Sequence, residues 1–256
     1  MVTLSCNGKL FRNIHAVFLD KDGTLANVAN YLIQLGHIQA QLMEQELPGT
    51  CALILKALGL TPEGLTASGL LAVGSRQETI LGAASAAAIT GCPWVQAVEL
   101  ATATFAIADK KCSPKAVYTP LLPGVLGLLQ RLRQANLKLI MVSADSQSNL
   151  EQFVEHYELA AYFDHLQGVS NQNPSKTAFD FLPRACQAIG LLPNQGVVIG
   201  DSASDLRMAE SAKGFIGYLG GWQPVLSPID ILGDMGSSVS LDCSFIADFR
   251  QLDILA

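Results

Sequence analysis

The hydrophobic positions change their spacing along the chain, and each spacing predicts a different kind of element. Residues 2–12 are typical of a short β-hairpin whose turn is Asn7-Gly8. Residues 14–19 form a nearly continuous apolar run, which predicts a buried strand of a parallel sheet. Between residues 27 and 113 the spacing is helical almost throughout, so this segment is expected to be an all-helical insert.

Strands and helices alternate in the rest of the chain. Three apolar strand patterns are separated by amphipathic helical patterns, at residues 137–144, 196–201 and 214–220. Such alternation implies a parallel sheet with right-handed crossovers. The predicted fold is therefore an α/β core with a doubly wound parallel sheet, formed by residues 1–26 and 114–256, into which a helical domain of residues 27–113 is inserted.

A polar residue closes each of three predicted strands. Asp20 follows the first core strand, Ser143 the second and Asp201 the third. In an open parallel sheet the ligand crevice lies at the carboxyl ends of the strands. Any one of these residues alone is typical of a turn or a helix cap, but three in one doubly wound pattern predict a shared site.

The segment Asp20-Lys21-Asp22-Gly23-Thr24 has the composition of a turn and also the chemistry of a phosphate site. The two-residue spacing puts both carboxylates on one side of an extended segment. Gly23 permits a sharp turn, and Thr24 can satisfy the loop backbone or a bound oxyanion. One carboxylate can attack phosphorus while the other protonates the leaving oxygen. Two anions repel a phosphate, so a hard cation such as Mg²⁺ is required.

Other polar residues can complete this site. Asp201 and Asp205 in "GDSASD" can supply the rest of the metal ligands, although the same segment is also a good helix N-terminus. Ser143 can donate a hydrogen bond to a phosphoryl oxygen. Lys176 precedes a helical pattern and can neutralise the remaining negative charge, whereas a lone lysine is more often a solvated charge.

Four segments resemble the motifs of the haloacid dehalogenase superfamily of phosphotransferases, and in particular its phosphoglycolate phosphatase-like members. They are "FLDKDGTL" (18–25), "LIMVSAD" (139–145), "NPSKTAF" (173–179) and "VVIGDSASDLRMAESA" (197–212). The resemblance implies that the insert between the first two motifs is a helical cap. It also implies a final strand and helix in "SFIADFRQLDIL" (244–255).

The resemblance assigns roles to individual residues. It implies that Asp20 is a nucleophile that forms an aspartyl-phosphate, and that Asp22 is the general acid and base, with its backbone carbonyl facing the metal. The metal ligands would be Asp20, Asp22, Asp201 and Asp205, and the phosphoryl-binding residues would be Gly23, Thr24, Ser143, Ala144 and Lys176.

The lysine motif is shifted relative to the family pattern Lys-Pro-x-Pro-x-x-Phe. Aligned on Phe179, the expected lysine is Asn173, followed by Pro174. Lys176 remains the candidate, because a long flexible side chain can reach back. Asp22 argues against carbon–halogen hydrolases, which lack this second aspartate, and against ion-pumping ATPases, which have threonine there. The neighbouring Lys21 does not distinguish these branches.

Arg76 is the candidate for substrate specificity. It lies in "LLAVGSRQETI" (70–80), which looks like the cap loop that reaches toward the active site in related phosphoglycolate phosphatases and sugar-phosphate mutases. There Arg76 would bind a substrate carboxylate or a second phosphate. The alternative interpretation is an exposed residue in the first turn of a helix.

Composition excludes several classes of protein. The net charge of −6 and the absence of a long basic run argue against a nucleic-acid partner. The six cysteines form no C-x-x-C pair, which argues against zinc and favours reduced thiols in the cytoplasm. No signal peptide is expected. The apolar segment 80–108 is rich in Ala, Ser and Thr, is interrupted by "TGCPW" and contains Glu99, so it predicts two buried helices and no membrane span.

Together these features predict a Mg²⁺-dependent phosphatase that acts on a small phosphorylated metabolite, such as phosphoglycolate. A sugar phosphomutase with the same nucleophile is the alternative, and a binding protein with a retired site is a third hypothesis. A homodimer is left open.

Overall fold

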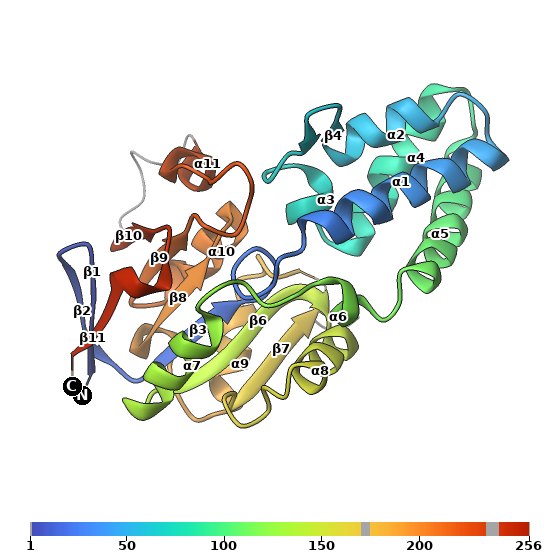
Figure 1. The fold of residues 1–256 in the computed structure, drawn as a ribbon. Helices are drawn as coiled ribbons and strands as arrows, with labels where there is room; N and C mark the ends of the chain where they lie inside the picture. The colour runs from blue at the N-terminus through green and yellow to red at the C-terminus, as the bar shows by residue number, and fades with distance from the viewer. Residues whose placement is uncertain (1, 170–174, 234–240, 256) are drawn as a thin grey trace. The chain divides into compact units, whose positions relative to one another are not determined.

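The chain forms two compact units. The computed structural model describes residues 2–169, 175–233 and 241–255. One unit comprises Met1–Asn27 with Pro120–Ala256, and the other comprises Val28–Thr119 (Figure 1). The helical unit extends past the expected end at residue 113 because the short helix α6 (Lys115–Tyr118) belongs to it.

The first unit is built on a six-stranded sheet in which neighbouring strands are parallel. The strand order is β10-β9-β8-β3-β6-β7. These strands are β3 (Ala16–Asp20), β6 (Lys138–Ser146), β7 (His165–Val169), β8 (Gly196–Gly200), β9 (Gly214–Tyr218) and β10 (Cys243–Ile246). All five residues of β3 are buried, as its apolar run predicts. The predicted doubly wound parallel sheet is confirmed.

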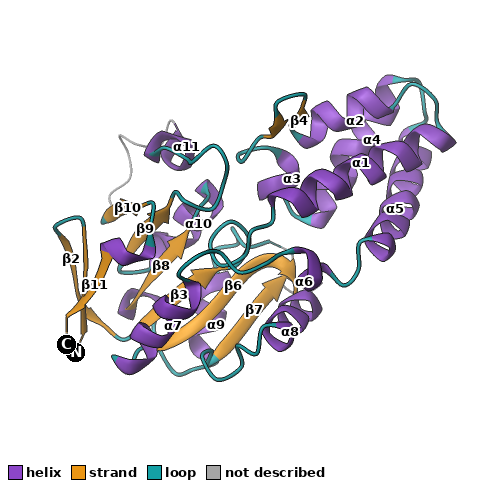
Figure 2. Cartoon of the chain, viewed as in Figure 1, coloured by secondary structure: helices purple, strands orange, loops and turns teal. Residues whose placement is uncertain are grey.

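Helices cover both faces of this sheet (Figure 2). On one face, Phe18, Ile140 and Val198 pack against residues of α9, α10 and α11. Alternate strand residues such as Val17 and Met141 are also buried, and both α7 and α8 contact β6. These helices are α7 (Val125–Gln134), α8 (Gln147–His156), α9 (Phe181–Gln187), α10 (Ala203–Met208) and α11 (Pro228–Leu232).

A small antiparallel sheet joins the two ends of this unit. Its order is β11-β1-β2, with β1 (Val2–Cys6), β2 (Lys9–Ile14) and β11 (Leu252–Leu255). Asn7 and Gly8 have φ values of 49° and 81°, so the predicted hairpin turn is confirmed. The predicted final helix is wrong. The segment instead forms a single 3-10 turn followed by the strand β11, which pairs with β1. Because β1 lies at the opposite end of the sequence, the local spacing of hydrophobic residues could not reveal this pairing.

The second unit is mainly helical. It contains α1 (Ala29–Glu46), α2 (Cys51–Leu58), α3 (Leu70–Val73), α4 (Arg76–Ile89), α5 (Trp94–Lys111) and α6. Its alanine-rich segment forms the close contact between α4 and α5, where Ala83, Ala87 and Ala101 are buried. Among the described residues, no helix combines the length and apolar character needed to cross a membrane. The insert is not entirely helical as expected, because β4 (Leu60–Thr61) and β5 (Gly64–Leu65) form a short hairpin with two residues in each strand.

Candidate active site

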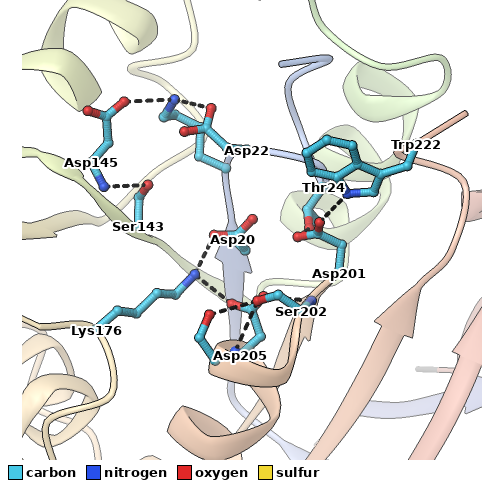
Figure 3. Close-up of polar contacts among 12 residues, drawn as sticks. Asp20, Asp22, Thr24, Ser143, Asp145, Lys176, Asp201, Ser202, Asp205 and Trp222 are labelled. Atoms are coloured by element: carbon cyan, nitrogen blue, oxygen red, sulfur yellow. Dashed lines mark hydrogen bonds and ion pairs between the residues drawn. The ribbon is translucent and has the colours of Figure 1, made fainter. Parts of the chain in front are cut away.

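The three polar residues predicted to close strands lie on or directly after neighbouring strands, although β6 continues past Ser143 to Ser146. β8, β3 and β6 are neighbours in the sheet, and Asp20 is paired with Val142, directly before Ser143. Asp201 follows the last residue of β8. Because the strands are parallel, their carboxyl ends meet at one edge of the sheet. Figure 3 shows the side chains that gather there.

The turn after β3 is held by one carbonyl group. The backbone amides of Leu25 and Ala26 both donate to the carbonyl oxygen of Lys21, at 2.8 Å each. Gly23 has a φ of 85°, and a Cβ at this position would collide with the carboxylate of Asp201. Glycine is therefore required both for the turn and for the approach of Asp201.

An acidic cluster lies beside this turn. Ligand oxygens of Asp20, Asp201 and Asp205 all lie within 4.8 Å of one another, and all three residues are buried. Asp20 Oδ2 has no hydrogen-bond partner, although it is shielded from solvent. A buried carboxylate oxygen without a partner is costly, and a hard cation would satisfy it. The cluster therefore fits Mg²⁺ in charge and in ligand type.

Lys176 brings a positive charge to the same cluster. Its buried ammonium group forms ion pairs with Asp20 Oδ1 and with Asp205 Oδ1. α9 begins at Phe181, so Lys176 lies in the turns that precede this helix. The displaced lysine thus reaches Asp20, as its candidate role requires. Asn173 and Pro174, which the family pattern aligns with the lysine and first proline, lie outside the described residues.

Burial and charge shift the pKa values in this cluster. Burial raises the pKa of Asp20 from 3.8 to about 7, against the opposing effect of Lys176 and with a further contribution from Asp205. Burial and the neighbouring Asp20 and Asp205 also raise the pKa of Asp201. Burial lowers the pKa of Lys176, but the carboxylates of Asp20 and Asp205 have the larger combined effect, so the pKa of Lys176 is raised. One lysine does not balance three carboxylates, so ionisation of the whole cluster requires a second cation.

Donors fix the orientation of Asp201 on both of its oxygens. Thr24 Oγ1 donates to Asp201 Oδ1 at 3.2 Å, and Trp222 Nε1 donates to Asp201 Oδ2 at 2.5 Å. Thr24 therefore supports an acidic side chain in this structure, a contact that the sequence did not suggest. Trp222 was missed entirely. Its only sequence signal is its rarity, because the chain has two tryptophans.

Asp205 is held by the start of α10. The backbone amide and hydroxyl of Ser202 both donate to Asp205 Oδ2, at 3.1 and 2.5 Å, while the amide of Asp205 donates to Ser202 Oγ. This reciprocal arrangement is a capping box. The two interpretations of "GDSASD" are therefore compatible, since the segment caps a helix and also contributes to the acidic cluster.

Ser143 lies beside Asp20 and is almost fully buried, while Ala144 is partly exposed. The hydroxyl oxygen of Ser143 accepts a hydrogen bond from the backbone amide of Asp145 at 3.1 Å. This contact leaves the hydroxyl hydrogen available for another acceptor, which is what phosphoryl binding would require.

Lys21 and Asp22 form a second charged group near the acidic cluster. The carboxylate of Asp22 is not part of the three-residue cluster, and it forms an ion pair with Lys21. Lys21 also pairs with Asp145 Oδ2 at 3.1 Å. Lys21 thus engages the carboxylate of Asp22, and the backbone carbonyl of Asp22 remains a candidate metal ligand.

Arg76 is engaged within the helical unit. It is the first residue of α4, and its guanidinium group pairs with Asp109 Oδ2 at 2.5 Å. Its Cζ also lies 5.0 Å from the ring centroid of Phe105. Arg76 is therefore neither a fully exposed first-turn residue nor a group without a partner.

A doubly wound sheet with carboxylates and a serine on adjacent strands, and a buried lysine beside them, is typical of an α/β enzyme that acts on an anionic substrate. The family model of haloacid dehalogenase-like hydrolases matches residues 14–213. The chain belongs to this family.

One curated relative resembles part of this chain. A phosphoglycolate phosphatase from Chromobacterium violaceum is 30% identical over 97 residues, which span 38% of this chain and 44% of that protein. The aligned segment thus covers less than half the length of this curated relative.

Solved structures share the whole fold at lower identity. A haloacid dehalogenase-like hydrolase from Streptococcus pneumoniae has a TM-score of 0.59 and 20% identity, over 93% of this chain and 96% of its own. A candidate β-phosphoglucomutase from Thermotoga maritima has a TM-score of 0.56 and 17% identity, over 91% and 94%. At these identities the similarity establishes the fold alone.

Proposed function

We propose that this protein is a Mg²⁺-dependent phosphatase that hydrolyses a small phosphomonoester through an aspartyl-phosphate. One observation carries the proposal. Asp20, at the carboxyl end of a central strand, contacts Lys176 and lies within an acidic cluster with Asp201 and Asp205. Such a nucleophile, with a fixed cation on one side and a cation site on the other, suits the attack of a carboxylate on a dianionic phosphate.

The residues would divide the reaction as follows. A carboxylate oxygen of Asp20 forms a bond to phosphorus while the bond from phosphorus to the ester oxygen breaks. Asp22 gives its proton to that ester oxygen, which leaves as an alcohol. Asp22 then takes a proton from water, whose oxygen attacks phosphorus, and the bond to Asp20 breaks with release of inorganic phosphate.

The remaining residues would bind the phosphoryl group and the metal. Ser143 Oγ, the amide of Ala144 and the ammonium of Lys176 would hold the phosphoryl oxygens, next to the turn at Gly23. Mg²⁺ would be held by Asp20, Asp201, Asp205 and the backbone carbonyl of Asp22, and it would neutralise phosphate charge. Arg76 is not required by this scheme, because Asp109 and Phe105 already engage it.

The substrate and setting are also part of the proposal. The Chromobacterium violaceum relative supports a small carboxylated monoester of the phosphoglycolate type. We assign the helical unit, Val28–Thr119, the role of a cap that selects the substrate. All six cysteines are free, which supports a cytoplasmic enzyme with reduced thiols.

A panel of phosphomonoesters tests this function. Phosphate release should require Mg²⁺, should stop with a chelator and should be lost in Asp20→Asn. The exposed pair of Lys138 and Asp164 offers a control, because Lys138→Met should leave the activity unchanged. Unchanged activity in Asp20→Asn would overturn the mechanism. Isomerisation of a sugar phosphate that outpaces phosphate release would identify a phosphomutase instead.

A further inference from the structure

Lys21 is buried between two carboxylates that lie outside the acidic cluster. Its side chain is 1% exposed, and its ammonium group pairs with Asp22 and with Asp145 Oδ2. The same ammonium lies 5.3 Å from the ring centroid of Phe153. A lysine placed in such surroundings is costly unless charged partners compensate it. Its position therefore depends on Asp22 and Asp145.

Asp145 is itself fixed by the start of α8. Its Oδ1 accepts hydrogen bonds from Asn149 Nδ2 at 2.6 Å and from the backbone amide of Ser146 at 3.0 Å. Its Oδ2 is then directed to Lys21. A continuous chain of polar contacts thus connects the first turn of α8 to the carboxylate of Asp22. This chain of contacts joins the end of β6 to the turn after β3.

The two aspartates of "DKD" are therefore held by different lysines. Lys176 pairs with Asp20, and Lys21 pairs with Asp22. Figure 3 shows Asp22 and Asp145 on one side of Asp20, with Asp205 on the other. We propose that Lys21, held in place by Asp145, is a positioning residue: its ammonium group donates to Oδ1 of Asp22 and so orients the carboxylic acid form, whose Oδ2 carries the proton that passes to the leaving group. This inference rests on the proposed phosphatase function.

The physical reason is rotational freedom. The side chain of Asp22 is 20% exposed, so without a fixed partner it can turn towards water. General acid catalysis needs the proton within hydrogen-bonding reach of the leaving oxygen, and a misplaced acid loses much of its effect. A buried ammonium anchored to a second strand end provides the fixed partner. Lys21 would act through Asp22 and would not itself touch the substrate.

The test is the dependence of the rate on the leaving group. A good leaving group such as 4-nitrophenolate needs no proton, whereas an alkoxide needs one. The constant kcat/KM reports the steps up to release of the alcohol, so it isolates this proton transfer. Lys21→Met, which keeps the straight side chain near Phe153, should lower kcat/KM for an alkyl phosphate by about tenfold or more. For 4-nitrophenyl phosphate the same variant should retain most of its kcat/KM.

A double-mutant cycle separates positioning from a general structural defect. In the Asp22→Asn background, adding Lys21→Met should cost little further activity on the alkyl phosphate, because the group through which Lys21 acts is already absent. Additive losses would overturn the inference. Equal losses on both substrates in Lys21→Met alone would overturn it as well. Lys138→Met, the same change in an exposed ion pair, is the matched control and should not alter the ratio between the substrates.

Asp145→Asn gives a second test that does not remove the lysine. It weakens the anchor of Lys21 and should shift the substrate ratio in the same direction, by a smaller factor. If Lys21→Met does not fold, as judged by circular dichroism, this variant decides the question, and an unchanged ratio rejects the inference. Failure of the proposed function looks different, because the unsubstituted protein would then release phosphate from neither substrate.

Discussion

The indole nitrogen of Trp222 donates a hydrogen bond of 2.5 Å to Oδ2 of Asp201, a member of the acidic cluster. Trp222 is 4% exposed, and the backbone at Gly221 presses against the carbonyl group of Gly23, so this loop is fixed against the turn after β3. The other tryptophan, Trp94, is 50% exposed and belongs to the helical unit. One tryptophan thus contacts the candidate metal site, and the second serves as an internal control.

Replacement of this donor should weaken metal binding. Trp222→Phe keeps an aromatic ring but removes the hydrogen bond that orients Asp201, and loss of such outer partners lowers metal affinity by about tenfold to a hundredfold. Titration calorimetry with Mg²⁺ measures the effect without reference to activity. Trp94→Phe should bind Mg²⁺ as the unsubstituted protein does. Equal affinities in all three proteins would show that Trp222 does not support the site.

Terbium luminescence should locate the cation directly. Tb³⁺ is a hard cation that accepts carboxylate oxygens, and excitation of a nearby indole sensitises its emission. Emission should appear on Tb³⁺ addition, persist in Trp94→Phe and disappear in Trp222→Phe. Excess Mg²⁺ should displace Tb³⁺ and abolish this emission. Emission that depends on Trp94 would place the bound ion in the helical unit and contradict the assigned cluster.

The stability of the metal-free protein should depend on pH through Asp20. Its pKa rises from 3.8 to about 7 on folding, so the folded state retains a proton that the unfolded state releases. This contribution is fully present below pH 3.8 and is lost as the pH rises towards 7. In the presence of a chelator, the free energy of unfolding of the unsubstituted protein should therefore fall between pH 3.8 and about 7, relative to that of Asp20→Asn. Saturating Mg²⁺ should remove the difference, and denaturant unfolding with and without Mg²⁺ measures it.

Removal of Lys176 should destabilise the folded protein. Lys176→Met leaves the buried Asp20 and Asp205 without their shared cation, and breaking a buried pair in this way costs about 3–5 kcal/mol. Mg²⁺ should recover part of this loss, because it neutralises the same carboxylates. Lys138→Met breaks an exposed pair with Asp164 and should cost at most about 1 kcal/mol. Similar losses in the two variants would contradict the burial argument.

Arg76 should contribute to the helical unit more than to substrate affinity. Arg76→Met breaks the partly exposed pair with Asp109, which should cost at most about 1 kcal/mol, and should leave the KM for phosphoglycolate unchanged. Asp109→Asn breaks the same ion pair, so it should have the same small effect on stability and leave the KM unchanged. A rise in KM that occurs in Arg76→Met but not in Asp109→Asn would support the sequence-based expectation that Arg76 binds a substrate carboxylate.

The sequence predicted the parts of this structure that depend on local patterns. The apolar run before Asp20 and the alternation after residue 118 predicted the parallel sheet, and parallel strands bring their carboxyl ends together without further information. For that reason the convergence of Asp20, Ser143 and Asp201 could be inferred. The proximity of Lys176 was expected only from the length of its side chain.

Contacts between distant segments were not visible in these patterns. β11 pairs with β1, Trp222 binds Asp201, and Asp145 binds Lys21. In each case the two partners are distant in sequence and come together only when the sheet has folded. Lys21 shows this most clearly. It separates none of the branches of the family by sequence, yet in the structure it is one of two buried lysines in the described part of the chain, and it holds the side chain of Asp22.

The backbone amide of Asn27 donates a hydrogen bond of 2.8 Å to the carbonyl oxygen of Pro120, and that of Leu122 donates to Leu25 at 2.8 Å. The helical unit therefore leaves the sheet and returns to it at a single point. For the sheet, the whole helical unit is therefore one long connection between Asn27 and Pro120. The entropic cost of closing such a loop grows only slowly with its length. The unit can accordingly be shortened, enlarged or exchanged without altering the strand ends, so changes in the helical unit need not disturb the acidic cluster.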